Sequence, residues 1–561
     1  MRVTSKSGDM VVPDVIGLRL WKMLKVPELD DMDLRCILVH KFPLLDHFIS
    51  VFIAMFSKIR TAYNSRKLVI LNDGVPPRPA SIRDLMRFCK RCNALFLAVG
   101  VRSSTDLISD QLKELLFQEA LDCFTSFLSS NASIEFLCEI IGNTLEIPTS
   151  RINLQMNRHT ASLTIFDDSI TIGRAKLKRN HIVGLHRQAK LGGYNEGSST
   201  FSRTNHSLLL MEKIGVAVSM CEPIVLVGET GTGKTTIVQE MAKLLHKKLT
   251  VINVSQQTEV SDLLGGYKPV NAKTLALPIE EDFENLFSRS FSVKKNERFL
   301  RLLAKCFNKS QWKNVIRLWQ EAYKMAKATF TVSTESDDKE MSRKKKRKLN
   351  DTDRSELLEE WHEMYGRIDN FGKQFKNIEN SFVFQFVEGA LVKAIKNGEW
   401  LLLDEVNLAS PETLDSISDL LTDEIEQRSI LLSEKGDIES IKADPEFRIF
   451  ACMNPATDVG KKNLPLSIRS MLTEIYVHSP DEDINDLLMI IDKYIGKYAL
   501  SDEWVGNDIA ELYLSSKKTC KYSSDSGWSQ PETTVQHSYP YKNTFLRYGH
   551  NRNLWIETFT L

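Results

Sequence analysis

The chain has 561 residues, which is too long for one compact core and predicts about two to four domains. Hydrophobic residues make up 42% and charged residues 26% of the sequence, as in ordinary soluble globular proteins. The 73 basic residues balance the 73 acidic ones, so no overall electrostatic field draws the chain to nucleic acid or to a membrane.

Membrane insertion is not expected from the sequence. The N-terminal residues lack the apolar core of a secretory signal. The most apolar run, at 42–59, is interrupted by Asp46, His47 and Ser50 and is too short to span a bilayer. We therefore expect a soluble intracellular protein without a membrane partner.

Residues 1–150 are predicted to form a mostly helical domain. Apolar residues recur at helical spacing over 15–60, and amphipathic helices are expected over 80–100 and 107–130. The change of pattern after 150 marks the end of this domain.

Cysteines give no sign of a disulfide framework. Nine are scattered along the chain, mostly singly, which is typical of a cytosolic or nuclear protein. Cys89 and Cys92 have CxxC spacing, but no second pair or histidine cluster accompanies them. Two turns of a helix are therefore favoured over a redox or zinc site.

Residues 151–204 are predicted to be a linker with short strands. ASLTIFDDSITIGRAKLK alternates like a pair of strands, and LGGYNEGSSTFSRTN is a connector rich in glycine and serine.

Residues 205–480 alternate short apolar strands with helical patterns. Such a rhythm predicts an α/β fold whose parallel sheet is covered by helices on both faces, a three-layer core. The expected strands are at 223–228, 249–254, 400–405, 448–453 and 474–477.

A charged helical insertion interrupts this region at about 280–380, and part of it is too polar to order itself. It contains RKKKRK at 343–348, which is compatible with a nuclear-import signal, a nucleic-acid contact or a solvated tract. Residues 481–561 begin as a helix and lose periodicity after about 515, where no core element is expected.

GETGTGKT at 228–235 fits the phosphate-binding pattern G-x-x-x-x-G-K-T and lies between a strand and a helix. Glycines let the backbone curl so that its N–H groups face phosphate oxygens, and the following helix adds its N-terminal partial charge. Lys234 is expected to reach the β- and γ-phosphates and Thr235 to hold Mg²⁺. The predicted nucleotide-binding residues are Gly228, Glu229, Thr230, Gly231, Thr232, Gly233, Lys234, Thr235 and Thr236.

Two later strands supply polar groups for the same site. WLLLDEVNLA ends its strand in Asp404, expected to hold Mg²⁺, and Glu405, expected to orient and polarise the attacking water. RIFACMNPATD places Asn454 after a strand, where its amide could hold that water from the other side.

This order of motifs is similar to that of the AAA+ ATPases. LLGGYKPV, FVEGALVKAIKNGEWLLLDEVNLASPE and FACMNPATDVGKKNLPLSIRS look specifically like the midasin family, a dynein-related branch, over about 15–515. The resemblance implies that LRLWKML (18–24) and the helices up to 150 are the end and helical lid of a first AAA+ module. Residues 205–480 would then be the core of the second module.

The resemblance also implies cofactors and partners. These are ATP and Mg²⁺, other AAA+ modules of a ring, and pre-60S ribosomal particles with their assembly factors. A nuclear location, in nucleolus and nucleoplasm, is implied as well. No sequence-specific binding to nucleic acid is predicted.

Two departures from the family pattern bear on catalysis. Where the family has Arg-x-Arg-Phe, this chain reads IRSMLTE, so Arg469 is the candidate for the arginine that acts on a neighbouring module's phosphate. The helical lid expected after the second core is not readable in the polar tail. The other half of the site is then expected outside this chain.

We accordingly expect the isolated chain to bind nucleotide and to hydrolyse it weakly. A non-catalytic nucleotide-binding scaffold is the alternative, and a nucleic-acid-dependent enzyme such as a helicase has only RKKKRK in its favour.

Overall fold

The computed structural model describes residues 29–71, 78–100, 110–158, 160–180, 201–270, 272–292, 295–331, 351–378, 383–422, 424–455, 463–495 and 506–525. The segment LRLWKML at 18–24 and the basic run at 343–348 lie outside these residues. The chain divides into two compact units. One contains Met1–Glu259, Ala394–Ile430 and Ile441–Leu561, and the other contains Val260–Lys393 and Leu431–Ser440.

The first unit opens with helices that share one apolar core, as expected for residues 1–150. They are α1 (Asp31–Lys41), α2 (Asp46–Tyr63), α3 (Arg66–Leu71), α4 (Ile82–Val99), α5 (Asp110–Phe124), α6 (Asn131–Thr144) and α7 (Thr149–Arg158). Phenylalanines of α2, α4 and α5 meet at its centre, where Phe52 packs edge-on against Phe88.

Local sequence signals fix both ends of α4. The Asp84 carboxylate accepts a hydrogen bond from the backbone N–H of Ser81 at 2.8 Å, which satisfies a donor of the first turn. Gly100 ends the helix in a left-handed conformation with φ 82°. Cys89 and Cys92 both lie buried on this helix, which confirms the helical interpretation of their spacing.

A small antiparallel sheet follows, with strand order β1-β2-β3. Its strands are β1 (Leu163–Ile165), β2 (Ser169–Ile172) and β3 (Ala175–Lys178), so the predicted pair of strands is a three-stranded sheet. Ile170, Ile172 and Leu177 share a core cluster with residues of α9 (Asn205–Ser219), among them Leu210 and Ile214.

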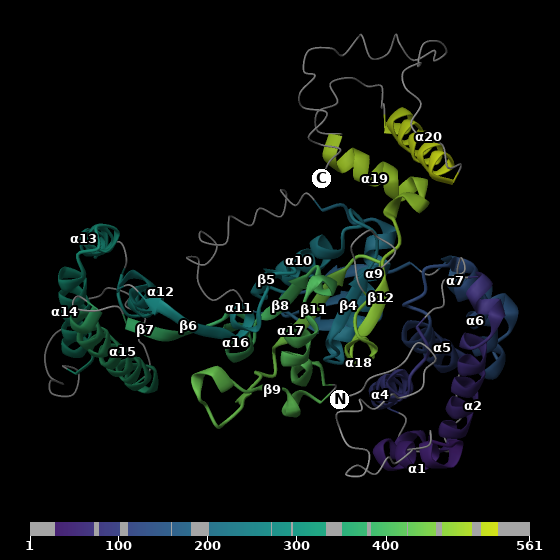
Figure 1. Cartoon of the computed structure of the whole chain (residues 1–561), viewed down its shortest axis with the longest axis horizontal. Helices are drawn as coiled ribbons and strands as arrows, with labels where there is room; N and C mark the ends of the chain where they lie inside the picture. The colour runs from purple at the N-terminus through teal and green to yellow at the C-terminus, as the bar shows by residue number, and fades with distance from the viewer. Residues whose placement is uncertain are drawn as a thin grey trace, which may run out of the picture. The chain divides into compact units, whose positions relative to one another are not determined.

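The centre of the first unit is a five-stranded parallel sheet with the order β12-β4-β11-β8-β5 (Figure 1). Its strands are β4 (Ile224–Val227), β5 (Leu249–Asn253), β8 (Trp400–Asp404), β11 (Arg448–Met453) and β12 (Thr473–Tyr476), which confirms the five predicted strands. All four residues of β4 are buried, as are the first four of β8, so side chains pointing to either face are covered. The predicted α/β fold is confirmed.

Short elements complete this part of the chain. Its helices are α10 (Lys234–Leu244), α16 (Ala390–Asn397), α17 (Pro411–Ser416) and α18 (Leu466–Arg469), and β9 (Ser429–Ile430) pairs with β10 (Ile441–Lys442). After β12 come α19 (Ile484–Ile495) and α20 (Gly506–Asp525).

The helix α20 continues past the predicted loss of periodicity at about 515, to Asp525. Its first half supplies the apolar spacing, with Ala510 buried, and the helix then runs on through a serine- and lysine-rich stretch. The Tyr513 hydroxyl donates to the Asp481 carboxylate at 2.9 Å, a contact between distant residues that local periodicity does not reveal. No described helix combines the length and apolar character needed to cross a bilayer.

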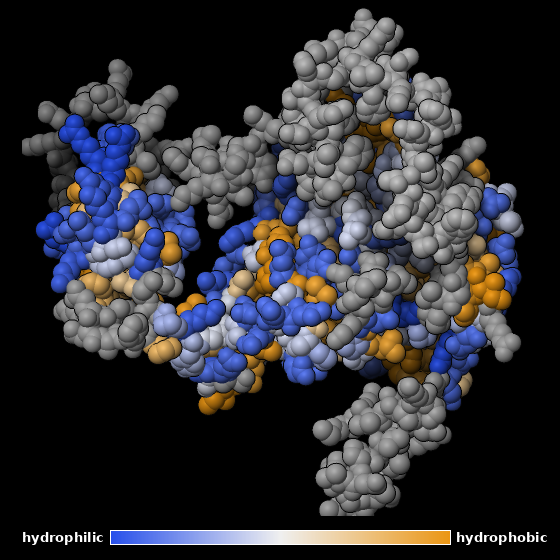
Figure 2. Space-filling view, turned by 45° about the horizontal axis from the view of Figure 1, so that its top comes forward, coloured by the Kyte–Doolittle hydropathy of each residue, from blue (hydrophilic) through white to orange (hydrophobic). Residues whose placement is uncertain are grey.

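The second unit is a helical bundle with a two-stranded sheet. This sheet pairs β6 (Gly265–Val270) with β7 (Val383–Glu388) in antiparallel register, and the long helices of the bundle lie between the two strands in the chain. Its helices are α11 (Val260–Leu264), α12 (Ala272–Ser290), α13 (Glu297–Asn308), α14 (Trp312–Thr331) and α15 (Asp351–Ile378). Phe283, Trp319 and Trp361 pack together in its core, while the face visible in Figure 2 (left) is largely hydrophilic.

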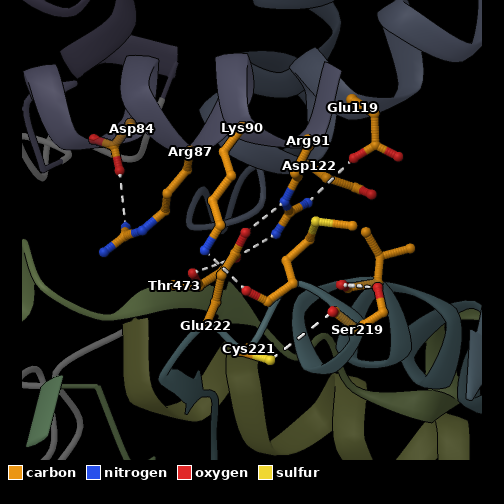
Figure 3. A network of polar contacts seen from close by, with 12 residues as sticks. Asp84, Arg87, Lys90, Arg91, Glu119, Asp122, Ser219, Cys221, Glu222 and Thr473 are labelled. Carbon is orange, nitrogen blue, oxygen red and sulfur yellow. Dashed lines mark hydrogen bonds and ion pairs between the residues drawn. The ribbon is translucent and has the colours of Figure 1, made fainter. Parts of the chain in front are cut away.

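Within the first unit, α4 packs against the amino ends of β4 and β12. The Arg91 guanidinium makes two hydrogen bonds to the Glu222 carboxylate, at 2.9 and 2.6 Å (Figure 3). Thr473 donates its hydroxyl to the same carboxylate at 2.7 Å, and Lys90 donates to the Met220 carbonyl at 3.1 Å. Buried charge therefore joins the helical region to the sheet.

Candidate functional site

The predicted phosphate loop connects β4 to α10 at the carboxyl end of the sheet. Gly231 and Gly233 have φ 83° and 84°, in the left-handed region that favours glycine. An added Cβ would meet no atom within 4 Å at either position, so space lies open above the loop. α10 begins at Lys234, which directs its first N–H groups toward the loop.

Gly228 is required for a different reason, because it lies against the backbone. A Cβ at this position would come within 2.5 Å of the Val477 carbonyl oxygen, which follows β12. Its N–H donates to the Met453 carbonyl at 3.3 Å, at the end of β11. The loop is therefore anchored between two neighbouring strands.

Hydrogen bonds within the loop hold its shape. The Lys234 ammonium donates to the carbonyls of Gly228 at 2.8 Å and Glu229 at 2.6 Å, and Lys234 is 8% exposed. Thr232 donates its hydroxyl to the Glu229 carbonyl at 3.0 Å. The side chains of Glu229, Thr230 and Thr236 are exposed.

The first helical turn after the loop meets the end of β8. Thr235 donates its hydroxyl to the Asp404 carboxylate at 3.0 Å, although 169 residues separate them. The sheet order explains this contact, since the carboxyl ends of parallel strands share one edge. The two residues predicted to hold a metal ion are thus brought together.

Glu405 and Asn454 follow β8 and β11 at that same edge. Glu405 has φ 57°, which is uncommon for a residue with a side chain, and its N–H donates to the Asp404 carboxylate at 3.1 Å. Asn454 is buried, and because β11 lies between β4 and β8 it stands between the loop and the acidic pair.

Sequence reasoning missed Asn407. This buried side chain donates its Nδ2 to the Asn454 carbonyl at 3.2 Å and so ties the segment after β8 to the segment after β11. The DEVN sequence contained it, but nothing local distinguishes a structural asparagine from a turn former.

Arg469 lies away from this edge. It ends α18, shortly before β12, whose first residue Thr473 pairs with Ile224 at the amino end of β4. Its guanidinium makes two hydrogen bonds to the buried Glu474 carboxylate, at 2.7 and 2.5 Å. The structure therefore does not bring Arg469 to the loop of its own sheet.

Two cysteines near functional segments are chemically quiet. Burial raises the pKa of the Cys89 thiol to about 12. Burial, helped by the Asp404 charge, raises the pKa of the Cys452 thiol on β11 to about 12 as well. Both stay protonated near neutral pH, which makes them poor nucleophiles.

Comparison with known proteins agrees with this geometry. Residues 33–148 match the midasin AAA lid domain, and residues 223–277 and 373–472 match the AAA domain of the dynein-related subfamily. The second match includes the phosphate loop and the acidic strand end.

Two relatives extend the match along the chain. Midasin from Dictyostelium discoideum is 36% identical over 465 residues, which is 78% of this chain and 8% of the relative. Midasin from Giardia intestinalis is 34% identical over 315 residues, 52% of this chain and 6% of the relative. This chain thus spans a small part of each relative's length, a lid followed by an AAA core, and it belongs to the midasin family of AAA+ ATPases.

Proposed function

We propose that this chain binds Mg²⁺-ATP at the 228–236 loop and hydrolyses it slowly. It would serve as the AAA+ module of a midasin-like remodelling ATPase in the maturation and nuclear export of pre-60S ribosomal particles. Membership of the midasin family supports the ATPase class, and the loop geometry supports the nucleotide.

The contact between Thr235 and Asp404 carries the proposal. A hydroxyl and a carboxylate lie 3.0 Å apart beside a loop with open space above Gly231 and Gly233. Both groups offer the hard oxygen ligands that Mg²⁺ prefers. When bound there, Mg²⁺ would neutralise charge on the phosphate oxygens.

The other residues have separable tasks. Backbone N–H groups of the loop and the start of α10 would bind the phosphates. Lys234 would exchange its hydrogen bonds to the loop carbonyls for hydrogen bonds to a phosphate oxygen. Glu405 would orient the attacking water and accept its proton. Asn454 would hold that water from the neighbouring strand.

Replacing Thr235 by valine is expected to remove most of the magnesium dependence of ATP binding. Valine keeps the side-chain shape but lacks the hydroxyl. Loss of residues that only support a metal ligand costs about 10- to 100-fold in metal affinity, so loss of the ligand itself should cost at least as much. Titration calorimetry with ATP in Mg²⁺ and in EDTA measures this. Thr61→Val, an exposed threonine of α2 outside the loop, is the matched control and should behave as the unmutated chain. Failure of the unmutated chain to bind ATP would contradict the proposal itself.

A nucleotide-binding scaffold is the second candidate, and the position of Arg469 away from the loop of its own sheet favours it. An arginine finger contributes about 10³-fold or more to turnover, so a loop that Arg469 does not reach should hydrolyse ATP slowly. We expect Glu405→Gln to bind ATP normally and to lower this slow turnover by about 10²-fold or more. Phosphate release from radiolabelled ATP gives the rate. Identical rates for the unmutated chain and Glu405→Gln would exclude hydrolysis and support the scaffold. Fast turnover by the unmutated chain that Glu405→Gln abolishes would contradict the proposal of slow hydrolysis.

Location and partners form the outer part of the proposal. Other AAA+ modules, pre-60S particles and their assembly factors are the proposed partners, in the nucleolus and nucleoplasm. Family membership alone supports them.

A further inference from the structure

One buried arginine of α4 holds the turn that follows Arg469. Arg87 donates to three successive carbonyls, those of Ser470 at 3.1 Å, Met471 at 2.6 Å and Leu472 at 3.0 Å. It is 3% exposed. A guanidinium presents its donors in a rigid fork, so three contacts to consecutive peptide groups fix both the place and the orientation of this turn.

A second arginine of α4 reaches the same turn from the exposed side. Arg83 lies one helical turn before Arg87 and donates to the Ser470 hydroxyl at 2.6 Å and to the Ser467 carbonyl at 3.4 Å. Ser470 is thus held through its carbonyl by one arginine and through its hydroxyl by the other.

Side chains provide a second connection between α4 and Arg469, and Arg87 touches it by donating to the Asp84 carboxylate at 3.4 Å. Asp84 of α4 accepts a hydrogen bond from Arg78 at 2.9 Å, and the Arg78 Nε lies 3.7 Å from the Glu474 carboxylate. Glu474 in turn holds the Arg469 guanidinium at two oxygens. The relay therefore runs from α4 through Arg78 and Glu474 to Arg469.

Little free space remains where α4 packs against the segment around Glu474. The cavity among Arg78, Asp84, Arg87 and Glu474 has a volume of about 10 Å³, room for about one water molecule. A rotation of α4 against the sheet would therefore move the turn or break the hydrogen bonds that Arg87 makes to it.

We propose that Arg87 is the positioning residue for Arg469, so that the helical region 29–158 sets the direction in which Arg469 points. The use of Arg469 on a neighbouring phosphate rests on the proposed function, whereas its positioning by Arg87 does not. A change in the orientation of the helices in region 29–158 would thereby be transmitted to Arg469 through α4.

Side-chain NMR of the full chain tests this without nucleotide. Arg469→Lys identifies the Nε–H signal of Arg469 in protein labelled with ¹⁵N-arginine. In Arg87→Met we expect this signal to move toward that of exposed arginines. Hydrogen exchange at the Arg469 Nε–H should become faster by about tenfold or more. The reason is that Arg87→Met removes the charged hydrogen bonds that hold the turn next to Arg469.

Lys90→Met is the matched control. Lys90 lies on the same helix and donates to the Met220 carbonyl, which lies before β4, so its loss weakens the docking of α4 at a different point of the chain. Its Arg469 signal should stay as in the unmutated chain, even where the thermal midpoint falls. An unchanged Arg469 signal in folded Arg87→Met would overturn the proposal, as would an equal shift in Lys90→Met.

Arg87→Lys is the second variant should Arg87→Met fail to fold. It keeps the charge, but one ammonium cannot span three successive carbonyls, so a smaller shift in the same direction is expected. No shift in folded Arg87→Lys would also overturn the proposal. Because ATP is absent throughout, failure here leaves the ATP-binding and turnover experiments to decide the proposed function separately.

Discussion

Alanine at Lys234 is expected to weaken Mg²⁺-ATP binding by about 10- to 100-fold. The Lys234 ammonium lies buried among the loop carbonyls of Gly228 and Glu229, within the curl that would receive the phosphates. A hydrogen bond to a charged group contributes about 1.5–3 kcal/mol, and each 1.4 kcal/mol is a tenfold change in affinity. Titration calorimetry on the full chain measures the loss.

Lys243→Ala separates this effect from a general change of charge. Lys243 lies near the other end of the same helix, with its side chain 57% exposed and its ammonium 3.9 Å from the buried Glu240 carboxylate. Its removal changes net charge equally and should leave the affinity within about twofold, because it lies away from the loop. Equal affinities for Lys234→Ala and the unmutated chain, with both folded by circular dichroism, would exclude the loop as the ATP site.

The sheet and its loop could be predicted because their signals are local. A strand buried on both faces reads as a short apolar run, and the β4 and β8 segments IVLV and WLLLD are of this kind. Gly231 and Gly233 indicate a backbone conformation with positive φ that other residues rarely adopt. The meeting of Thr235 with Asp404 then followed from parallel strands ending at one edge.

Contacts between distant side chains carry no such local signal. Arg91 and Glu222 are 131 residues apart, and each read by itself is an ordinary charged residue near a helix or strand end. The same holds for Glu474, which binds Arg469 and approaches Arg78. Only the packing of α4 on the strands decides which charges become buried and paired. These contacts between α4 and the sheet therefore could not be predicted from the sequence.

Among the contacts between α4 and the sheet, loss of the Glu222 carboxylate is expected to be the most destabilising single change. Glu222→Ala should lower the free energy of unfolding by about 3–5 kcal/mol, because it leaves the buried Arg91 guanidinium without its main partner. Thr473 also loses its acceptor. Chemical denaturation followed by circular dichroism measures the change.

Glu424→Ala provides the comparison. Its ion pair with Lys41 spans 3.2 Å, but the two side chains are 49% and 51% exposed, so the loss should be about 0–1 kcal/mol. Similar losses for the two variants would show that burial adds nothing to the Glu222 pair.

The stability difference between the unmutated chain and Glu222→Gln should also depend on pH. Burial by itself would raise the pKa of Glu222, but the charge and hydrogen bonds of Arg91, with Arg87 and Thr473, outweigh burial and hold it below the ordinary 4.5. A carboxyl with a lowered pKa stabilises the folded state above its unfolded pKa and loses that effect as pH falls through the folded value. The difference should therefore be constant from neutral pH down to about 5 and shrink below 4.5. A difference that stays constant down to about pH 3 would mean that the pKa of Glu222 is the same in the folded and unfolded states, so that shape rather than charge holds α4 to the sheet.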